Sequence, residues 1–231
     1  MTRRALPTTV AGVITRMREI DAQLPPGDGV GVFHHMYLTV TERIEAIIAG
    51  SDHELRFRDP AAMAELDVRF ANLWLAAYDA AAAGREVPKA WQPLFGARDG
   101  RRWPIQYAVG GMNTHIEHDL PLAVVATCAR RGLEPDEVHA DYEAVNAVLA
   151  QVESAIRRSF LTEIGQAADD RVGPAVHLVS AWSIDKARDL SWTTVQTLWA
   201  LREHDWLEAR VRSALASTVG MATRTLLTPT R

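Results

Sequence analysis

The sequence predicts an all-α protein, folded as one domain of about seven or eight helices. Two observations lead to this prediction. Apolar residues recur at i, i+3 and i+4 through most of the 231 residues, the spacing that gives a helix one apolar face. No segment alternates apolar and polar residues with the β-branched enrichment of a half-buried strand. We therefore expect a single helical bundle over residues 1–231.

Three long helices are expected in the first third of the chain, over residues 8–24, 30–50 and 60–83. Each has the helical apolar period and is followed by a glycine, the residue that most easily adopts the left-handed conformation ending a helix. The third begins at Asp59-Pro60, a capping side chain followed by a proline that suits the first helical turn. A short segment at residues 88–95 leads into a charged turn.

The rest of the chain predicts four further helices, over residues 104–131, 134–161, 176–203 and 206–227. The segment 134–161 places acidic residues first and basic residues last, as the helix dipole favours. The only break with the composition of a linker, residues 165–174, is short. The sequence therefore predicts no boundary between domains.

The composition and charge of the chain argue against several classes of function. Hydrophobic residues make up 48% of the chain, charged residues 23%, and the net charge is −4 with arginines scattered. A nucleic-acid partner needs a concentrated basic patch, so none is expected. The single Cys128 cannot form an internal disulfide. With no signal peptide, membrane span or lipidation motif, we expect a cytoplasmic protein without a membrane partner; a homodimer remains open.

A polar cluster interrupts the apolar run at residues 110–125, "GGMNTHIEHDLPLAVV". On a helix, His115 and Asp119 share a face because they are four residues apart, while His118 and Asn113 flank that face. Pro121 lacks an N–H group, so the pattern predicts a kink or break in the central helix there. A buried site in a bundle is one interpretation. In the other, Asp119 caps a helix beginning near Leu120 and His115 is a core side chain.

A second informative stretch is "WSIDKARDLSWTTVQTLWALRE", where aromatic and charged residues share one sector of a helix. Such a stripe is either core or the aromatic wall of a substrate pocket. On the helix at residues 60–83, two aromatic residues share a face with Asp67. The candidate substrate-binding residues are Trp192, Trp199, Tyr78, Trp74, Asp185 and Arg188. His34 and His35 are interpreted as core or surface residues.

The stretch "GMNTHIEHDLPLAVV", with "DVRFANLWLAAYDA" before it and "HADYEAVNAVL" and "WSIDKAR" after it, resembles a bacterial family catalogued as domain of unknown function 5995. The resemblance extends from the second helix to the C-terminus. The family hallmark, G-x-N-x-H-I-x-x-D-L, falls on Gly111, Asn113, His115, Ile116, Asp119 and Leu120. This resemblance implies relatives and no particular chemistry.

The run "HIEHDLPLA" is also similar to a motif of zinc-dependent phospholipases C and related single-strand nucleases, which are all-α proteins. Those enzymes bind several zinc ions through many His and Asp ligands. This chain lacks their mature N-terminal Trp and their full set of histidines.

Three functions remain open, and the first two act on a small, partly apolar substrate. In a metal-dependent hydrolase, a divalent metal such as zinc would be held by His115, Asp119, Asp67 and His118. In a metal-free cyclase, isomerase or lyase, His115 would be the acid/base, oriented by Asp119, with Asn113 donating to a developing oxyanion. In a non-enzymatic binding or scaffold protein, the cluster would only stabilise the helix. No nucleotide or redox cofactor motif is present.

Overall fold

The computed structural model describes residues 5–166 and 182–229, and every regular element in these ranges is helical. The all-α class is therefore confirmed, with no strand among the described residues. The elements are α1 (Val10–Asp21), α2 (Gly29–Ile48), α3 (Pro60–Ala82), α4 (Gln92–Gly96), α5 (Pro104–Thr114), the π-helical turn η1 (His115–Asp119), α6 (Leu120–Arg131), α7 (Pro135–Gln166), α9 (Ile184–Leu201) and α10 (Asp205–Leu226).

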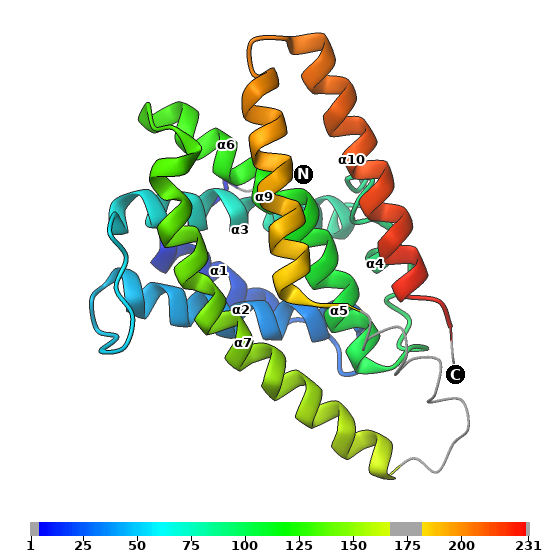
Figure 1. Cartoon of the computed structure of the whole chain (residues 1–231). Coiled ribbons are helices and arrows are strands. Elements are labelled where there is room, and N and C mark those ends of the chain that lie inside the picture. The colour runs from blue at the N-terminus through cyan, green and yellow to red at the C-terminus, as the bar shows by residue number, and fades with distance from the viewer. Residues whose placement is uncertain (1–4, 167–181, 230–231) are drawn as a thin grey trace.

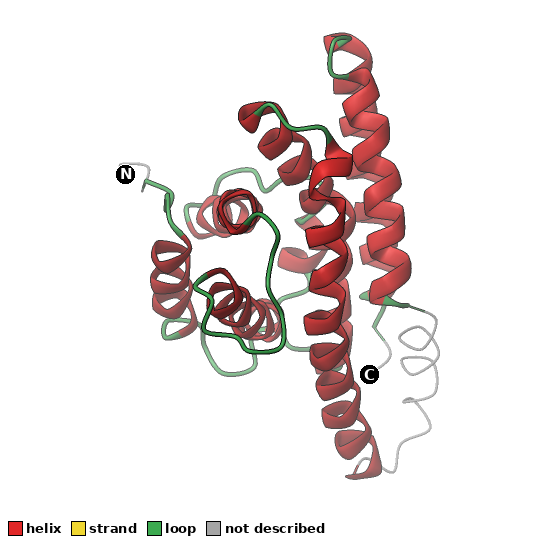
Figure 2. Ribbon diagram, turned by 60° about the vertical axis from the view of Figure 1, so that its left-hand side comes forward, coloured by secondary structure: helices red, strands yellow, loops and turns green. Residues whose placement is uncertain are grey.

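The helices form two crossed groups with one central segment between them. Figure 1 shows α1, α2 and α3, in blue to cyan, lying across the view, whereas α9 and α10, in orange to red, stand nearly upright. Figure 2 shows the same crossing from another side. The central segment α5–η1–α6 contacts both groups, because α5 packs on α2 and α10, and α6 packs on α3 and α9. Most of its side chains are therefore buried.

Side-chain caps fix the start of the N-terminal helices. The Thr9 hydroxyl accepts from the Gly12 N–H, Asp28 accepts from Val30, and Asp59 accepts from Ala62 with a proline following. Each cap satisfies an N–H that a helix start leaves without a partner. At the end of α6, Gly132 adopts the left-handed conformation (φ 67°). The expected start of α3 after Asp59 and the expected end of α6 at residue 131 are confirmed, whereas α7 extends five residues beyond the expected 134–161.

The central segment differs from the expectation at Pro121. The chain stays helical through this proline, and the irregularity is the π-turn η1 immediately before it, where the Leu120 N–H donates to the His115 carbonyl five residues earlier. Pro121 has no N–H to donate to the carbonyl one turn earlier. This lost hydrogen bond favours a local change from α-helical to π-helical bonding. Asp119 makes no capping hydrogen bond. The capping interpretation of Asp119 is therefore wrong.

The glycine pair before η1 allows close packing. A Cβ at Gly111 would overlap the Phe33 ring of α2, and one at Gly110 would lie 3.2 Å from Leu227. The absence of a Cβ at Gly110 and Gly111 thus permits close approach, with side chains of the protein as the neighbours. This approach brings α2 against the segment that carries the polar cluster.

Two expectations lie partly outside the described residues. Residues 167–174 of the linker-like stretch and residues 176–181 of the predicted helix 176–203 lie outside the described residues, whereas residues 165–166 end α7. The described part of that helix, α9, begins at Ile184. Of the described helices, none is both long enough and apolar enough to cross a membrane.

Candidate functional site

The carboxylate of Asp119 is the centre of a buried hydrogen-bond cluster. It lies at the end of η1, is 1% exposed, and accepts three hydrogen bonds. His115 Nδ1 donates to Oδ2 at 2.9 Å, His118 Nδ1 donates to Oδ1 at 2.7 Å, and the indole N–H of Trp91 donates to Oδ2 at 3.0 Å. The sequence placed His115 and Asp119 on one face, and the structure joins them directly.

The ionisation of this cluster follows from its contacts. Burial alone would raise the pKa of Asp119, but the hydrogen bonds from His115 and His118 outweigh it and lower the pKa. Asp119 is therefore ionised and can only accept. Burial lowers the pKa of His115 despite the opposing effect of Asp119. His115 is thus neutral near pH 7, with its proton on Nδ1 and a lone pair on Nε2.

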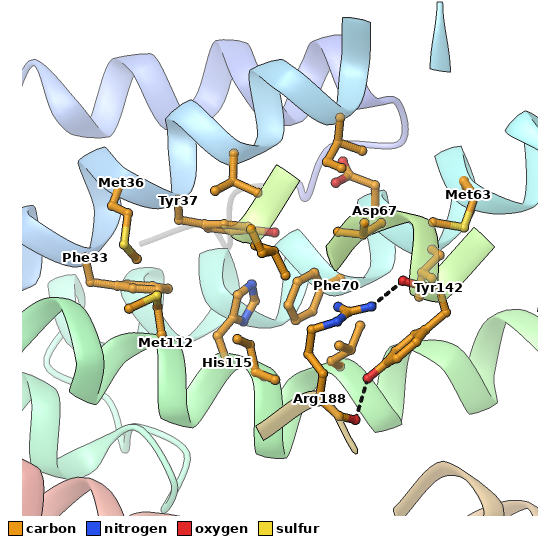
Figure 3. Close-up of a pocket in the computed structure, with 17 residues that line it drawn as sticks. Phe33, Met36, Tyr37, Met63, Asp67, Phe70, Met112, His115, Tyr142 and Arg188 are labelled. Carbon is orange, nitrogen blue, oxygen red and sulfur yellow. Dashed lines mark hydrogen bonds between the residues drawn. The ribbon is translucent and has the colours of Figure 1, made fainter. Parts of the chain in front are cut away.

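The His115 ring forms part of the wall of an apolar cavity of about 90 Å³ (Figure 3). Its Nε2 is buried and has no hydrogen-bond partner in the described part of the chain. The cavity is lined by side chains of α2, α3, α5, η1, α6, α7 and α9, namely Phe33, Met36, Tyr37, Val40, Ile44, Met63, Leu66, Asp67, Phe70, Met112, His115, Ile116, Leu120, Tyr142, Val145, Leu149 and Arg188. An imidazole with an unsatisfied basic nitrogen therefore lies in the wall of an apolar space.

Aromatic contacts hold the imidazole in place. The Phe70 ring of α3 stacks on His115 with 3.6 Å between ring centroids and 8° between planes. Tyr37 of α2 meets it edge-on at 4.4 Å. With Nδ1 bonded to Asp119, the ring cannot rotate without losing these contacts. Nε2 therefore keeps one direction, as an acid or base requires.

Asp67 is the second titratable group of the cavity. It is 7% exposed, and its Oδ2 has no hydrogen-bond partner among the residues described. Burial raises its pKa to about 7, because an apolar environment disfavours the charged carboxylate. The negative charge of Asp67 also contributes to raising the pKa of Tyr37 after the effect of burial, so the two groups are close neighbours. Near neutral pH, Asp67 is present in both protonated and ionised forms.

The remaining predicted residues divide between the cavity and the core. Arg188 lines the cavity. Asn113 does not, because two residues along a helix differ by about 200°. Its amide donates to Thr223 Oγ1 at 3.1 Å and accepts from the Trp182 indole at 3.2 Å. A role for Asn113 at a substrate oxygen therefore finds no support in this geometry.

The aromatic stripe of α9 does not form a cavity wall. Trp192 packs on His139 and Tyr142, with ring centroids 4.2 and 4.9 Å away. The Trp199 indole donates to Glu134 at 2.7 Å and lies under Arg202, and Asp185 is exposed. The two tryptophans therefore fix α9 against α7 and the segment before it.

Two further aromatic candidates also belong to the core. Trp74 is fully buried against Phe33 and Trp91, and Tyr78 packs beside it. The interpretation of His34 as a core residue is confirmed by its burial and its bonds to Met17 and Trp74. His35 is exposed and lies 3.4 Å from Asp21.

The proposed metal ligands do not form a ligand cluster. Within residues 5–166 and 182–229, no three His, Cys, Asp or Glu side chains are arranged to hold a metal ion. His115 and His118 both use Nδ1 on Asp119, and Asp67 makes no bond to any of them. The chemistry of the described site is that of a carboxylate-bound histidine.

Sequence reasoning missed most of the cavity wall and one partner of Asp119. Phe70 and Tyr37 were hidden among ordinary core positions of α3 and α2, and Trp91 lies in a short segment with no strong pattern. The indole N–H of a tryptophan needs an acceptor when it is buried. That requirement is the one signal that could have linked Trp91 to a buried carboxylate.

Comparison with protein families identifies the family of the chain. The Family of unknown function (DUF5995) matches residues 10–229, nearly the whole sequence, and the chain belongs to this family. No curated protein and no solved structure shows a significant match. The family carries no assigned activity, so function has to be argued from the site.

Proposed function

We propose that this protein is a metal-free enzyme that moves protons on a small, largely apolar substrate bound in the cavity beside His115. The reaction class is an isomerase or lyase. One observation carries the proposal: His115 lines an apolar cavity and donates through Nδ1 to a buried carboxylate, while its Nε2 has no partner among the described residues.

His115 is proposed as the general base. A neutral imidazole with a free Nε2 can accept a proton from a substrate carbon or hydroxyl in the cavity. Asp119 holds the tautomer and ring orientation, and its negative charge stabilises the imidazolium that forms. The apolar walls exclude water, so no solvent hydrogen bond has to be displaced from Nε2 before the substrate approaches it.

Asp67 is proposed as the partner acid. Its pKa of about 7 leaves a substantial fraction protonated at neutral pH. A proton taken by His115 at one position and a proton given by Asp67 at another would shift a double bond, or assist a leaving group. Two titratable groups in different environments are the usual arrangement for such chemistry.

The other functions considered draw less support. A metal-dependent hydrolase needs three or more ligands, and the described residues offer no such cluster. A scaffold role would need only the Asp119 hydrogen bonds, and would leave the unpaired Nε2 and Asp67 without explanation. A buried polar group without a partner costs stability, and a substrate would provide the missing contacts.

The test is exchange of substrate hydrogen with solvent deuterium. Small apolar carbonyl and unsaturated compounds are incubated with the protein in D₂O, and deuterium at carbon is followed by NMR. We expect exchange or turnover with the wild type and at least a 100-fold loss with His115→Gln, since general acid–base groups contribute about 10²- to 10⁴-fold.

His35→Gln is the matched control, because His35 is exposed and lies outside the cavity. It should behave as the wild type. Compounds that bind in the cavity without any His115-dependent exchange would identify a binding protein and contradict the proposal.

A further inference from the structure

Arg188 is a buried cation in the wall of the cavity. It comes from α9, is 4% exposed, and its guanidinium carbon lies 3.9 Å from the centroid of the Tyr142 ring. It donates through Nη2 to the Tyr142 carbonyl, and the Tyr142 hydroxyl donates to the Arg188 carbonyl at 2.9 Å. Figure 3 shows these two bonds and the guanidinium extending toward the space between Phe70 and Tyr142.

No carboxylate of the described chain forms an ion pair with this guanidinium. The acidic side chains whose charge reaches it, Glu143, Asp185 and Asp189, are all exposed. Its Nε is buried and has no hydrogen-bond partner in the ranges described. A buried charge is costly unless it is paired, so the arrangement lacks an anion.

The two acidic groups nearest to the site do not supply that anion. Asp119 already accepts three hydrogen bonds from His115, His118 and Trp91. Asp67 lines the same cavity, but burial raises its pKa, whereas pairing with a guanidinium would lower it. The negative charge that Arg188 lacks must therefore come from a bound molecule.

We propose that Arg188 binds the carboxylate of the substrate, so that the substrate is a small, largely apolar carboxylic acid. This inference rests on the proposed function for the choice of site. A guanidinium presents several N–H groups in a planar fork that matches a carboxylate, and only one bond of the Arg188 side chain is used within the described protein. One cation balances one negative charge, which favours a monocarboxylate.

The rest of the cavity limits the size and shape of the hydrocarbon part of the acid. Its volume of about 90 Å³ is smaller than the engineered cavity of ~150 Å³ that admits benzene, so the acid has a short or compact hydrocarbon part. Met36, Met63 and Met112 in the wall can adjust to different shapes. In Figure 3 the Phe70 ring lies between the His115 imidazole and the Arg188 guanidinium. The acid must therefore pass the edge of Phe70 for its reacting carbon to approach His115.

The test compares acids with neutral analogues of the same shape. Butanoate, pentanoate and 3-methylbutanoate are titrated into the wild type by calorimetry at pH 7, beside the corresponding primary amides. We expect at least one acid to bind about 10-fold or more tightly than its amide, because hydrogen bonds to charged groups are the strong ones. Equal affinity of acids and amides, or no binding of any acid at millimolar concentration, would overturn the inference.

Substitutions at Arg188 then test whether this residue causes the preference for acids over amides. Arg188→Met should abolish it, while Arg202→Met should keep it. Arg202 is the matched control, because it also covers an aromatic ring, Trp199, but lies outside the cavity. If Arg188→Met does not fold, Arg188→Lys keeps a charge without the planar fork and should weaken the preference. A preference unchanged in a folded Arg188 variant would contradict the inference.

The inference and the proposed function can fail separately. His115→Gln should keep the preference for acids while losing deuterium exchange. Acid binding that depends on Arg188, without exchange of any acid, would support the carboxylate site and contradict the enzymatic function. Exchange that depends on His115 but is equal for acids and amides would support the enzymatic function and contradict the carboxylate site.

Discussion

Two buried histidines of this protein show what separates a structural histidine from a candidate base. His34 on α2 is fully buried and uses both ring nitrogens: Nε2 donates to the Met17 carbonyl at 2.8 Å, and Nδ1 accepts from the Trp74 indole at 3.1 Å. His115 is 2% exposed and uses only Nδ1, on Asp119. Burial lowers the pKa of both.

The difference lies in a single nitrogen. At His34 the hydrogen-bond capacity of the ring is exhausted, so the residue contributes to packing between α1, α2 and α3. At His115 one lone pair remains unsatisfied at the edge of a cavity. Burial, aromatic neighbours and a lowered pKa are common to both residues. They identify a functional histidine only together with an unpaired ring nitrogen on a side chain that lines a cavity.

The largest expected effect is that of Asp119→Ala. Three buried N–H donors lose their acceptor, so we expect the free energy of unfolding to fall by about 3–5 kcal/mol, together with loss of any activity. Chemical denaturation and the exchange assay measure the two effects. Asp141→Ala is the matched control, because Asp141 is buried and accepts from the backbone N–H groups of Arg58 and Asp59 away from the cavity.

Asp141→Ala should lose stability while keeping activity per folded molecule. Wild-type activity in a folded Asp119→Ala variant would contradict the role of Asp119 in holding His115.

His115→Gln and His34→Gln should have opposite activity profiles. We expect His115→Gln to lower the rate by about 10²- to 10⁴-fold because it removes the base. His34→Gln, measured per folded molecule, should stay within a few-fold of the wild type. Rates in the exchange assay, corrected for the folded fraction by circular dichroism, distinguish the two. A similar loss in both variants would mean that His115 acts through stability alone.

Substitution of the same two histidines should affect stability in the opposite order, with the larger loss at His34. His34→Leu leaves the Met17 carbonyl and the Trp74 indole without a partner, so we expect a loss of about 1–3 kcal/mol. His115→Leu removes one bond to Asp119 but also removes an unsatisfied buried nitrogen, and should cost less. Urea denaturation of both variants measures this. A larger cost at His115 would contradict the view that its ring is incompletely satisfied.

The smallest expected effect is the dependence of activity on pH. The reaction requires neutral His115 and protonated Asp67, whose pKa is about 7. Because the pKa of His115 is lowered below about 6.5, activity should be highest between these values and fall about tenfold per pH unit above pH 7. Asp67→Asn should have lower activity without that alkaline decline. Glu117→Gln is the control, since burial also raises the pKa of Glu117 to about 7 but Glu117 does not line the cavity.

The stability of Asp67→Asn supplies an independent check of the same pKa. Between the ordinary carboxyl value of 3.8 and about 7, the folded protein keeps the Asp67 proton that the unfolded chain releases. The unfolded chain then binds fewer protons, so the wild type loses stability relative to Asp67→Asn as pH rises through this window. Parallel stability curves for the two proteins would show that the pKa of Asp67 is not raised.

Much of the fold could be predicted from local signals. Apolar spacing and caps such as Asp59-Pro60 gave the helices, because each helix depends on its own residues. The i, i+4 relation between His115 and Asp119 was predictable for the same reason. The π-turn at His115–Asp119 was not, since it differs from an α-turn by one hydrogen-bond register and depends on packing against the neighbouring helices.

The cavity could be predicted only in part. Asp67 and Arg188 stood out as charged residues that share a helix face with aromatic residues, and both line the cavity. Phe70 and Tyr37 carry ordinary core patterns, so nothing local distinguishes a cavity wall from packed core. The tryptophans of α9 were candidates for either the core or the pocket wall, because helical spacing does not specify which neighbouring helix a face meets. In the structure neither lines the cavity, and Trp192 packs on the side chains of His139 and Tyr142.

The most direct measurement is the protonation of the two buried histidines, by long-range ¹H–¹⁵N correlation spectroscopy of the imidazole rings at pH 7. It needs no substrate. We expect His115 to be neutral with its proton on Nδ1 and an unprotonated Nε2, and His34 to be neutral with its proton on Nε2. A doubly protonated His115, or a proton on its Nε2, would contradict the proposal that His115 is the base of this site.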